Sequence, residues 1–290
     1  MPRYSPLTFA HYLPAAEANK RKEKVFGECK PLALPLMTAL LGVLYLGMLV
    51  ALVFLPGASL LDRLRWLDSG ICAQLATHSF YPGGERLPLC ARNTGIYLGF
   101  MVTLLTLYAT RRGRVQQLPP WPIIILLIGG GLAMVIDGFN SFLLDLGLQH
   151  LYQPDNLLRL ATGLATGLAV ATLVLPAINR LFWREHNEKR SISSWMALLL
   201  LTPGLILGFF AVASQNVLIL YPVALLSTAG ILTVLSSINL IVVLALSKRD
   251  QTFEHYRELW PFFSLALILA IGEMLALAQL KFSLLQALGM

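Results

Sequence analysis

The chain carries long apolar runs of the length that suits a membrane helix, and no other feature limits its fold as strongly. Seven runs can be read, at residues 32–55, 93–110, 122–145, 157–179, 195–213, 217–247 and 260–280. A helix needs about 20 apolar residues to cross the hydrocarbon core of a bilayer. Only 13% of the 290 residues are charged, and these gather between the runs. The sequence therefore predicts an all-α, polytopic transmembrane bundle of about seven spans.

Basic residues predict the orientation of this bundle. Of the 22 Lys and Arg residues, 16 lie before the first run or after runs two, four and six, and 6 lie on the other side. Basic residues are retained on the cytoplasmic side, so we expect a cytoplasmic N-terminus and an extracytoplasmic C-terminus in the cell (plasma) membrane. The net charge of +7 lies at the ends of the runs without interleaved aromatic residues. We therefore expect membrane lipids, and no nucleic acid, as partners.

The same pattern divides the chain into four segments. Residues 1–31 form a basic cytoplasmic tail that is too polar for a cleavable signal peptide, and residues 32–180 hold four spans. Residues 181–194 form a basic cytoplasmic linker, and residues 195–290 hold three further spans.

An extracytoplasmic loop is predicted at residues 56–92. Five apolar residues there follow helical spacing: Leu60, Leu64, Leu67, Ile71 and Leu75. Asp62, Arg65 and Asp68 lie off that stripe. The pattern predicts an amphipathic helix on the membrane surface or over the bundle. A turn is predicted at 80–85, because Pro82 presets one dihedral angle and the two glycines after it accept positive φ.

Small residues repeat four apart where two spans begin. Gly95 and Gly99 open span two, and Gly163 and Gly167 open span four. Span three contains three consecutive glycines at 129–131. Small residues at this spacing let helix backbones approach closely. We therefore expect spans two, three and four to pack tightly against one another.

Span three contains a carboxylate, Asp137, at roughly 12–14 Å from its predicted outer end. Asn140 and Ser141 share its helix face. An ionised carboxylate at this depth needs a partner or water, and Arg159 is the first candidate, followed by Arg92. Two interpretations stay open: a functional polar pocket, and an ion pair that only joins helices.

Together with their neighbours, these residues predict an outward-facing pocket for an anionic ligand. Guanidinium groups match the geometry of phosphate and carboxylate, and an anionic lipid headgroup suits such a site. The predicted ligand-binding residues are Arg92, Asn93, Thr94, Asp137, Asn140, Asn156, Arg159 and Thr162, with Arg86 as a further donor. The alternative is a structural or accessory subunit of a membrane complex, with other membrane subunits as its partners.

The cysteines offer a third function class. Cys29 lies before span one, whereas Cys72 and Cys90 share the predicted oxidising side, where they form either a disulfide or free thiols. A metal site built from Cys72, His78, Cys90 and His150 is a weaker alternative, because the spacing matches no standard zinc module. We predict no cofactor. The sequence contains no nucleotide-binding loop, hydrolase triad or HExxH, so whether the protein is an enzyme stays open.

Residues 71–100, IDGFNSF at 136–142 and DNLLRLATGLATG at 155–167 resemble a prokaryotic family of integral membrane proteins known as a domain of unknown function. The family pattern runs Cys-His-Gln, then Arg-Ser-Phe, then Pro-x-Cys-Ala-Arg-Cys-Thr-Gly-Ile-Tyr-x-Gly, then Asp-Gly in a span and Asn-x-x-Arg-x-x-Thr-Gly. The resemblance covers about residues 70–170. It implies an integral membrane protein and carries no established activity with it.

This chain departs from the family pattern at three positions. Ala73, His78 and Asn93 stand where the family has His, Arg and Cys. Two of the four groups of a Cys-His…Cys-x-x-Cys arrangement are thereby lost, which weakens the metal and thiol-redox interpretations. The departures leave intact the set of Arg92, Asp137, Asn156 and Arg159.

Overall fold

The structure is a computed structural model that describes residues 46–47, 50, 54–185 and 187–288. The predicted N-terminal tail and nearly all of the first predicted span lie outside these residues. The prediction that the tail is not a cleavable signal peptide therefore falls outside them too. The regular secondary structure of the described residues is helical, which confirms the all-α prediction. Its helices are α3 (Leu60–Asp68), α4 (Ala91–Ala109), α5 (Trp121–Asp145), α6 (Asn156–Phe182), α7 (Trp195–Leu199), α8 (Thr202–Ala213), α9 (Leu220–Ser247) and α10 (Tyr256–Ala287), with single 3-10 turns η1 (Ala76–His78), η2 (Pro82–Gly84) and η3 (Val217–Ile219).

Within this part of the chain, five helical segments are long and apolar enough to cross a membrane. They are α5, α6, α7 with α8, η3 with α9, and α10, and they correspond to predicted spans three to seven. Helix α4 falls outside this group, because Arg92 and Asn93 lower the mean hydropathy of its 19 residues. A membrane protein of several apolar helices is thus confirmed, whereas seven spans and the orientation of the termini stay predictions.

Two predicted spans differ from the helices that form. The fifth breaks into α7 and α8, and Pro203 lies in the first turn of α8. Proline suits that position because its missing N–H is not needed in a first turn. The seventh, expected over 260–280, extends to Tyr256–Ala287, since His255 and Glu258 form a capping box that starts the helix earlier.

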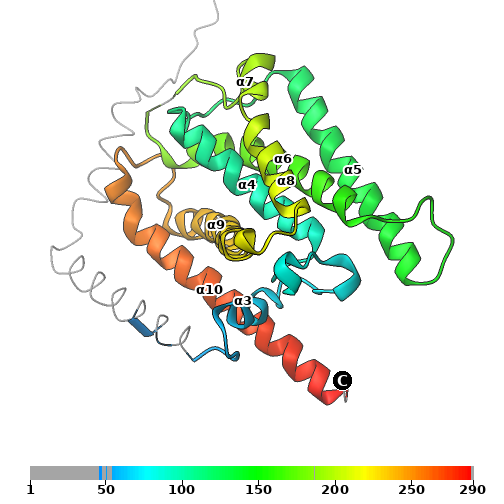
Figure 1. The fold of residues 1–290 in the computed structure, drawn as a ribbon. Coiled ribbons are helices and arrows are strands. Elements are labelled where there is room, and N and C mark those ends of the chain that lie inside the picture. The colour runs from blue at the N-terminus through cyan, green and yellow to red at the C-terminus, as the bar shows by residue number, and fades with distance from the viewer. Residues whose placement is uncertain (1–45, 48–49, 51–53, 186, 289–290) are drawn as a thin grey trace, which may run out of the picture. The chain divides into compact units, whose positions relative to one another are not determined.

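Helices α4 and α6 form the closest helix pair of the described bundle (Figure 1). A Cβ atom on Gly95 would lie 3.0 Å from the Cα of Gly163, and one on Gly99 would lie 2.9 Å from the Cα of Leu164. Gly167 lies against Ile96 and Phe100 in the same way. The contact advances along both helices in the same direction, so α4 and α6 run parallel.

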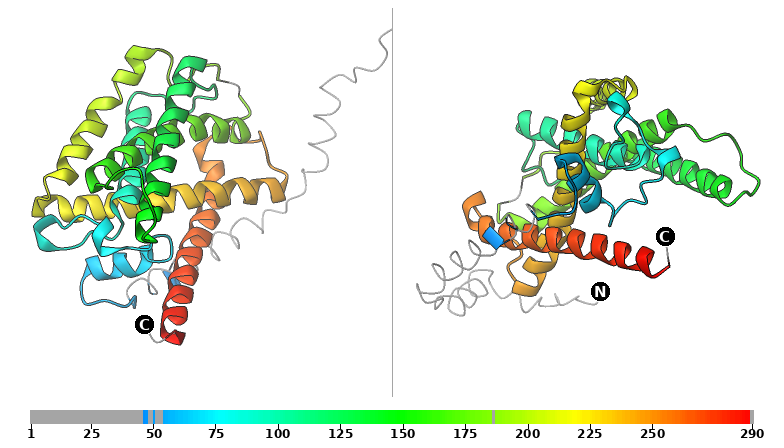
Figure 2. Two further views of the ribbon diagram at one scale, coloured as in Figure 1. Left: turned by 90° about the vertical axis from the view of Figure 1, so that its right-hand side faces the viewer. Right: turned by 60° about the horizontal axis from the view of Figure 1, so that its bottom comes forward.

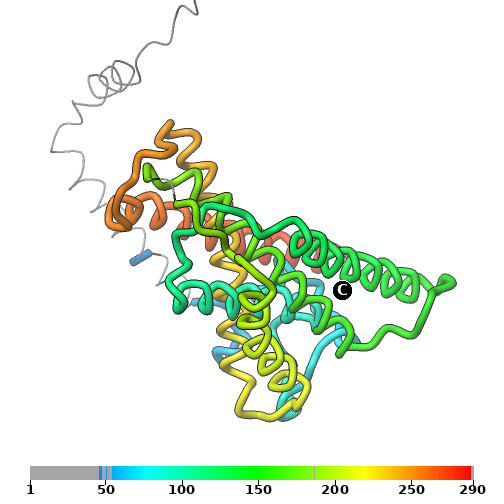
Figure 3. Tube along the Cα trace, turned by 90° about the horizontal axis from the view of Figure 1, so that it is seen from above, coloured from blue at the N-terminus to red at the C-terminus, as the bar shows by residue number. Residues whose placement is uncertain are grey.

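The remaining helices pack around this pair. Helix α5 lies beside α6 (Figure 3), where Gly130 faces Ala165, but nothing lies within 4 Å of a Cβ atom built on Gly129 or Gly131. Helices α9 and α10 cross on the other side (Figure 2), and α9 also contacts α4. Spans two, three and four were predicted to pack against one another. In the structure, span four (α6) contacts both span two (α4) and span three (α5).

The loops of the described chain group at two ends of the bundle. Residues 54–90, 146–155 and 214–216 meet at one, which we call the loop end: Gly83 N donates to Gln215 O, and Asn156 Nδ2 donates to Thr77 O. At the opposite end, residues 110–120, 183–194 and 248–255 meet in the same manner. The Pro82–Gly84 turn forms as predicted, with Gly83 and Gly84 at positive φ.

Helix α3 is shorter than the amphipathic helix that the sequence predicts, and it buries a different face. Ser59 caps its first turn by accepting from Asp62 N, and the helix ends at Asp68. After the helix end, Gly70 lies against α10, where a Cβ atom would be 2.7 Å from Ala278 N. Leu75 therefore never joins the stripe, Leu60 is exposed, and Asp68, expected on the polar face, is fully buried.

Candidate functional site

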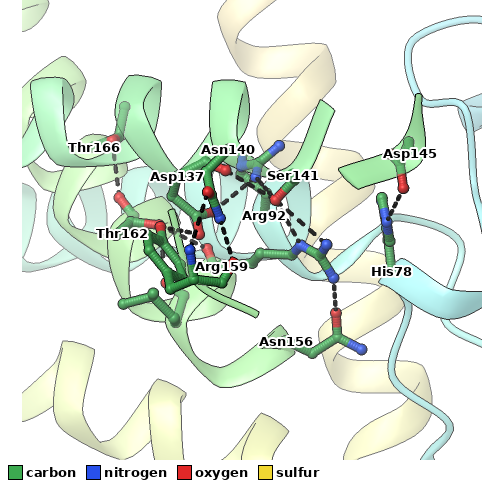
Figure 4. A network of polar contacts seen from close by, with 12 residues as sticks. His78, Arg92, Asp137, Asn140, Ser141, Asp145, Asn156, Arg159, Thr162 and Thr166 are labelled. Atoms are coloured by element: carbon green, nitrogen blue, oxygen red, sulfur yellow. Dashed lines mark hydrogen bonds and ion pairs between the residues drawn. The ribbon is translucent and has the colours of Figure 1, made fainter. Parts of the chain in front are cut away.

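A polar network fills the loop end of the contact between α4, α5 and α6 (Figure 4). At its centre, Arg92 of α4 donates through one guanidinium nitrogen to Asp137 Oδ2 of α5 at 2.7 Å and to Ser141 Oγ at 3.2 Å. Asp137 is 1% exposed and Arg92 21% exposed at the side chain. The carboxylate of this ion pair is therefore almost completely shielded from solvent, whereas the guanidinium is only partly shielded.

The second arginine of the network, Arg159, has different partners from those expected. Arg159 was the first candidate partner of Asp137, but the ion pair of Asp137 is with Arg92. Arg159 donates instead to two neutral oxygens, Asn156 Oδ1 at 2.7 Å and Ser141 Oγ at 3.3 and 3.4 Å. Ser141 thus lies between the two guanidinium groups, as Figure 4 shows.

The loop after α5 closes the network. Asn140 accepts from Leu151 N at 2.7 Å and donates to Tyr152 O at 2.8 Å. The Tyr152 hydroxyl donates to the second carboxylate oxygen of Asp137 at 2.9 Å. Both oxygens of Asp137 are therefore satisfied, one by α4 and one by the loop. This role of Tyr152 was not foreseen, since no local pattern marks a loop tyrosine.

A histidine and a second carboxylate flank the arginines. His78 Nε2 lies 3.2 Å from Asp145 Oδ1 at the end of α5. Burial lowers the pKa of His78 below its ordinary value, and the charge of Arg159 lowers it further. We therefore expect a neutral imidazole at pH 7, which leaves the Asp145–His78 contact a hydrogen bond and not an ion pair.

The remaining predicted ligand residues do not hydrogen-bond to the side chains of Arg92, Asp137 or Arg159. Thr94 donates to Leu89 O within the protein core, and Thr162 donates to Leu158 O on its own helix. Arg86 donates to Gln74 O in the loop. Asn93 lies beside Cys72. The structure thus gathers Arg92, Asp137, Asn140, Asn156 and Arg159, and adds Ser141, Tyr152, Asp145 and His78.

Cys72 and Cys90 are free thiols that lie next to each other. The backbone N–H of Cys90 donates to Cys72 Sγ at 3.4 Å. His78 contacts Asp145 and His150 contacts Leu148 O, so the four residues of the metal alternative are not brought together. Across the described ranges, no three His, Cys, Asp or Glu side chains form a group that could hold a metal ion.

Asp68 lies close to these thiols and was missed at the sequence level. Its Oδ2 accepts from the Thr228 hydroxyl at 2.7 Å, and its Oδ1 is buried without a hydrogen-bond partner among the described residues. Burial raises the pKa of Asp68 to about 7. The carboxyl therefore changes its charge near neutral pH.

This pKa predicts a pH-dependent stability that Asp68→Asn abolishes. The pKa of Asp68 in the folded protein lies above its ordinary value of 3.8, so the stabilising contribution is complete below about pH 4 and is lost as the pH rises through 7. The loss amounts to roughly 2–4 kcal/mol. Thermal unfolding in detergent across this pH range measures it. Asp250→Asn, at an exposed position, is the matched control and should retain the pH dependence of the wild type.

The comparison with known protein families matches the segment that holds the network. Residues 72–173 match the family described as predicted membrane protein (DUF2085). This confirms the resemblance expected over about residues 70–170. The DUF2085 segment contains both thiols, α4, α5, most of α6 and every residue of the polar network.

One curated relative matches part of the chain. The chain is 29% identical over 118 residues to the uncharacterized protein MJ1492 of Methanocaldococcus jannaschii. The aligned region covers 40% of this chain and 69% of that protein. No solved structure matches the chain. Neither the description of the family nor the name of the relative assigns an activity.

Proposed function

We propose that the polar network is an anion site at the loop end, and that it binds the anionic headgroup of a membrane lipid in the cell (plasma) membrane. Arg92 and Arg159 hold the anion. Asp137 orients Arg92, and Asn156 orients Arg159.

The burial of Arg159 without a counter-charge carries this proposal. Arg159 is 4% exposed, and it is not ion-paired with any carboxylate of the described residues. The single negative charge of Asp137 is shared with Arg92. The other nearby carboxylate, Asp145, contacts His78 and is 39% exposed at its side chain. Within the buried part of the network, two guanidinium groups therefore share one carboxylate, and the excess positive charge is costly in a low-dielectric interior. An anion offsets that cost.

The donors of the network suit a headgroup phosphate or carboxylate. The Nε–H of Arg92 is buried and has no acceptor among the described residues, so it is available to a ligand oxygen. Gly138 lies beside the guanidinium of Arg92, where a Cβ atom would be 3.6 Å from Cζ, and its missing side chain leaves this group uncovered. Arginine binds phosphate and carboxylate oxygens in pairs through its planar fork.

The position of the two arginines beside an exposed apolar helix face favours a lipid over a soluble anion as the ligand. The arginines belong to the first turn of α4 and α6, and α5 beside them exposes a row of large apolar side chains: Ile125, Ile128, Leu132, Val135, Ile136, Phe139 and Phe142. Such a surface suits contact with acyl chains. A lipid can place its chains on α5 and its headgroup at the arginines.

We expect Arg159→Gln to lose bound anionic lipid. Native mass spectrometry of the full chain, released from mixed phosphatidylglycerol and phosphatidylcholine, measures retention of each lipid. The wild type should retain phosphatidylglycerol, and Arg159→Gln should retain about tenfold less, as expected for the loss of one charge-assisted contact of about 1.4 kcal/mol. Inorganic phosphate added in excess should not displace the lipid.

The matched control is Arg180→Gln, which removes an exposed arginine at the opposite end of α6 and should retain the lipid. Equal retention by all three proteins would contradict the headgroup site. Displacement of the lipid by inorganic phosphate would assign the site to a soluble anion. Lipid-free protein that co-purifies with a second polypeptide would favour the accessory subunit.

A further inference from the structure

The two thiols of the loop end lie at the start of a helix. Cys90 is the residue before α4, and its backbone N–H donates to the sulfur of Cys72. The side chain of Asn93, in the first turn of the same helix, lies close enough to this sulfur to help lower the pKa of Cys72. Cys72 is buried, whereas Cys90 is half-buried. The first turn of a helix carries unpaired N–H groups and a partial positive charge, which stabilise a thiolate.

The loops that carry the thiols are held together without a disulfide. Gln74 Nε2 donates to Arg65 O at 2.7 Å and to Pro88 O at 2.6 Å. Arg86 donates back to Gln74 O at 3.0 Å, and Arg65 donates to Arg86 O at 2.7 Å. The backbone around Cys72 is fixed from a third side, because Lys281 of α10 donates to Cys72 O at 3.1 Å. A covalent bond between the cysteines is therefore not needed to keep this loop folded.

We propose that Cys72 and Cys90 form a reversible dithiol–disulfide couple that exchanges electrons with external thiols at the loop end. This site is separate from the proposed headgroup site, because the two thiols form no hydrogen bond with the side chains of the polar network.

The exchange follows from the different exposure of the two sulfurs. In the disulfide form, an external thiolate attacks the more accessible Cys90 Sγ, the bond between the cysteines breaks, and Cys72 leaves as a thiolate. A second external thiolate then attacks the external sulfur of the mixed disulfide and releases Cys90. In total, two external thiols become one disulfide, and their two electrons and two protons convert the protein disulfide into two thiols.

The surroundings of Cys72 make it a good leaving group. Hydrogen bonds from Cys90, first from its thiol and then from its backbone, lower the pKa of Cys72 to about 6, and burial opposes them. The hydrogen bond to Cys72 raises the pKa of Cys90. The charged and titratable groups that face the pair are Asp68 on α3, Arg92 and Tyr97 on α4, and Lys281 on α10. A thiol of low pKa leaves faster and stabilises the reduced form, so the disulfide is readily reduced.

Equilibration with glutathione tests the couple. The full chain carrying Cys29→Ser is incubated in mixtures of reduced and oxidised glutathione, quenched with acid and labelled with a maleimide that shifts the mass. We expect both cysteines to become protected together, in one two-electron transition, and to be recovered fully on reduction. Proteolysis should cut residues 70–90 equally slowly in both states, because the hydrogen bonds of Gln74 and Arg86 remain.

Two variants separate the couple from other roles of the thiols. Asn93→Ala should shift the equilibrium about threefold towards the disulfide, since the Asn93 side chain helps to lower the pKa of Cys72, and Asn93→Ser should restore part of the shift. Cys90→Ser should leave Cys72 unable to form an internal disulfide. Independent labelling of the two cysteines at every glutathione ratio would overturn the proposal. A loop that becomes protease-sensitive on reduction would also overturn it, by showing a structural disulfide.

Discussion

Asp137→Ala is expected to lower the free energy of unfolding by about 3–5 kcal/mol, the cost of leaving one member of a buried ion pair without its partner. Asp137 is 1% exposed and holds Arg92 at 2.7 Å and the Tyr152 hydroxyl at 2.9 Å. The substitution leaves the guanidinium of Arg92 and the hydroxyl of Tyr152 without their acceptor. Equilibrium unfolding in mixed micelles measures the loss.

Two comparisons show whether burial is the cause. The double variant Arg92→Leu with Asp137→Leu removes both charges and should recover most of the loss, because a buried pair replaced by apolar groups is often neutral. Glu254→Ala breaks an ion pair of similar length, 2.9 Å to Arg184, but both of its side chains are about half exposed. It should cost less than about 1 kcal/mol. An equal loss for Asp137→Ala and Glu254→Ala would contradict the description of the network as buried.

Gly167→Val is expected to prevent the bundle from folding, with a loss of at least about 3 kcal/mol. A Cβ atom on this residue would lie 2.5 Å from Phe100 N and 2.9 Å from Gly99 C, and both are backbone atoms of α4 that cannot move aside singly. The helices would have to separate, and the contact that positions Arg92 beside α6 would be lost with them. The yield of monodisperse protein and its thermal midpoint in detergent measure the effect.

The glycines of α5 provide a matched control for this prediction. Gly129→Val makes the same chemical change in a neighbouring apolar helix, but nothing lies within 4 Å of a Cβ atom at that position. Its midpoint should stay within a few degrees of the wild type, because helix propensity changes by less than about 1 kcal/mol. A comparable loss in both variants would mean that the substitution acts through membrane insertion and not through the α4–α6 contact.

The membrane helices could be predicted from the sequence because apolar length is a local property. Predicted spans three to seven match helices of the structure within a few residues, apart from the longer α10 and the break between α7 and α8. The α4–α6 approach was also foreseeable, since small residues four apart create a flat face whatever the partner. The glycines of α5 show the limit of that argument: only Gly130 meets a neighbour.

The site could be predicted in composition but not in pairing. Arg92 and Arg159 lie at the same level because Gly163 meets the backbone of Arg92, where a Cβ atom would be 2.5 Å from its carbonyl oxygen. Which of the two reaches Asp137 depends on the rotation of each helix, and spacing along the chain does not give rotation. Tyr152 joins from an irregular loop, where no periodicity applies. Asp68 was missed because α3 ends one turn early and buries the face on which this carboxyl lies.

The parallel contact of α4 and α6 also sets the order in which the bundle can assemble during synthesis. Helix α4 leaves the ribosome first, with the charge of Arg92 in its first turn. The carboxylate that neutralises this charge lies on α5, and the small-residue surface that receives its backbone lies on α6, and both are translated later. We therefore expect α4 to wait at the translocon until the next two helices have emerged. A nascent chain that stops before α6 should remain exposed to membrane quality-control proteases.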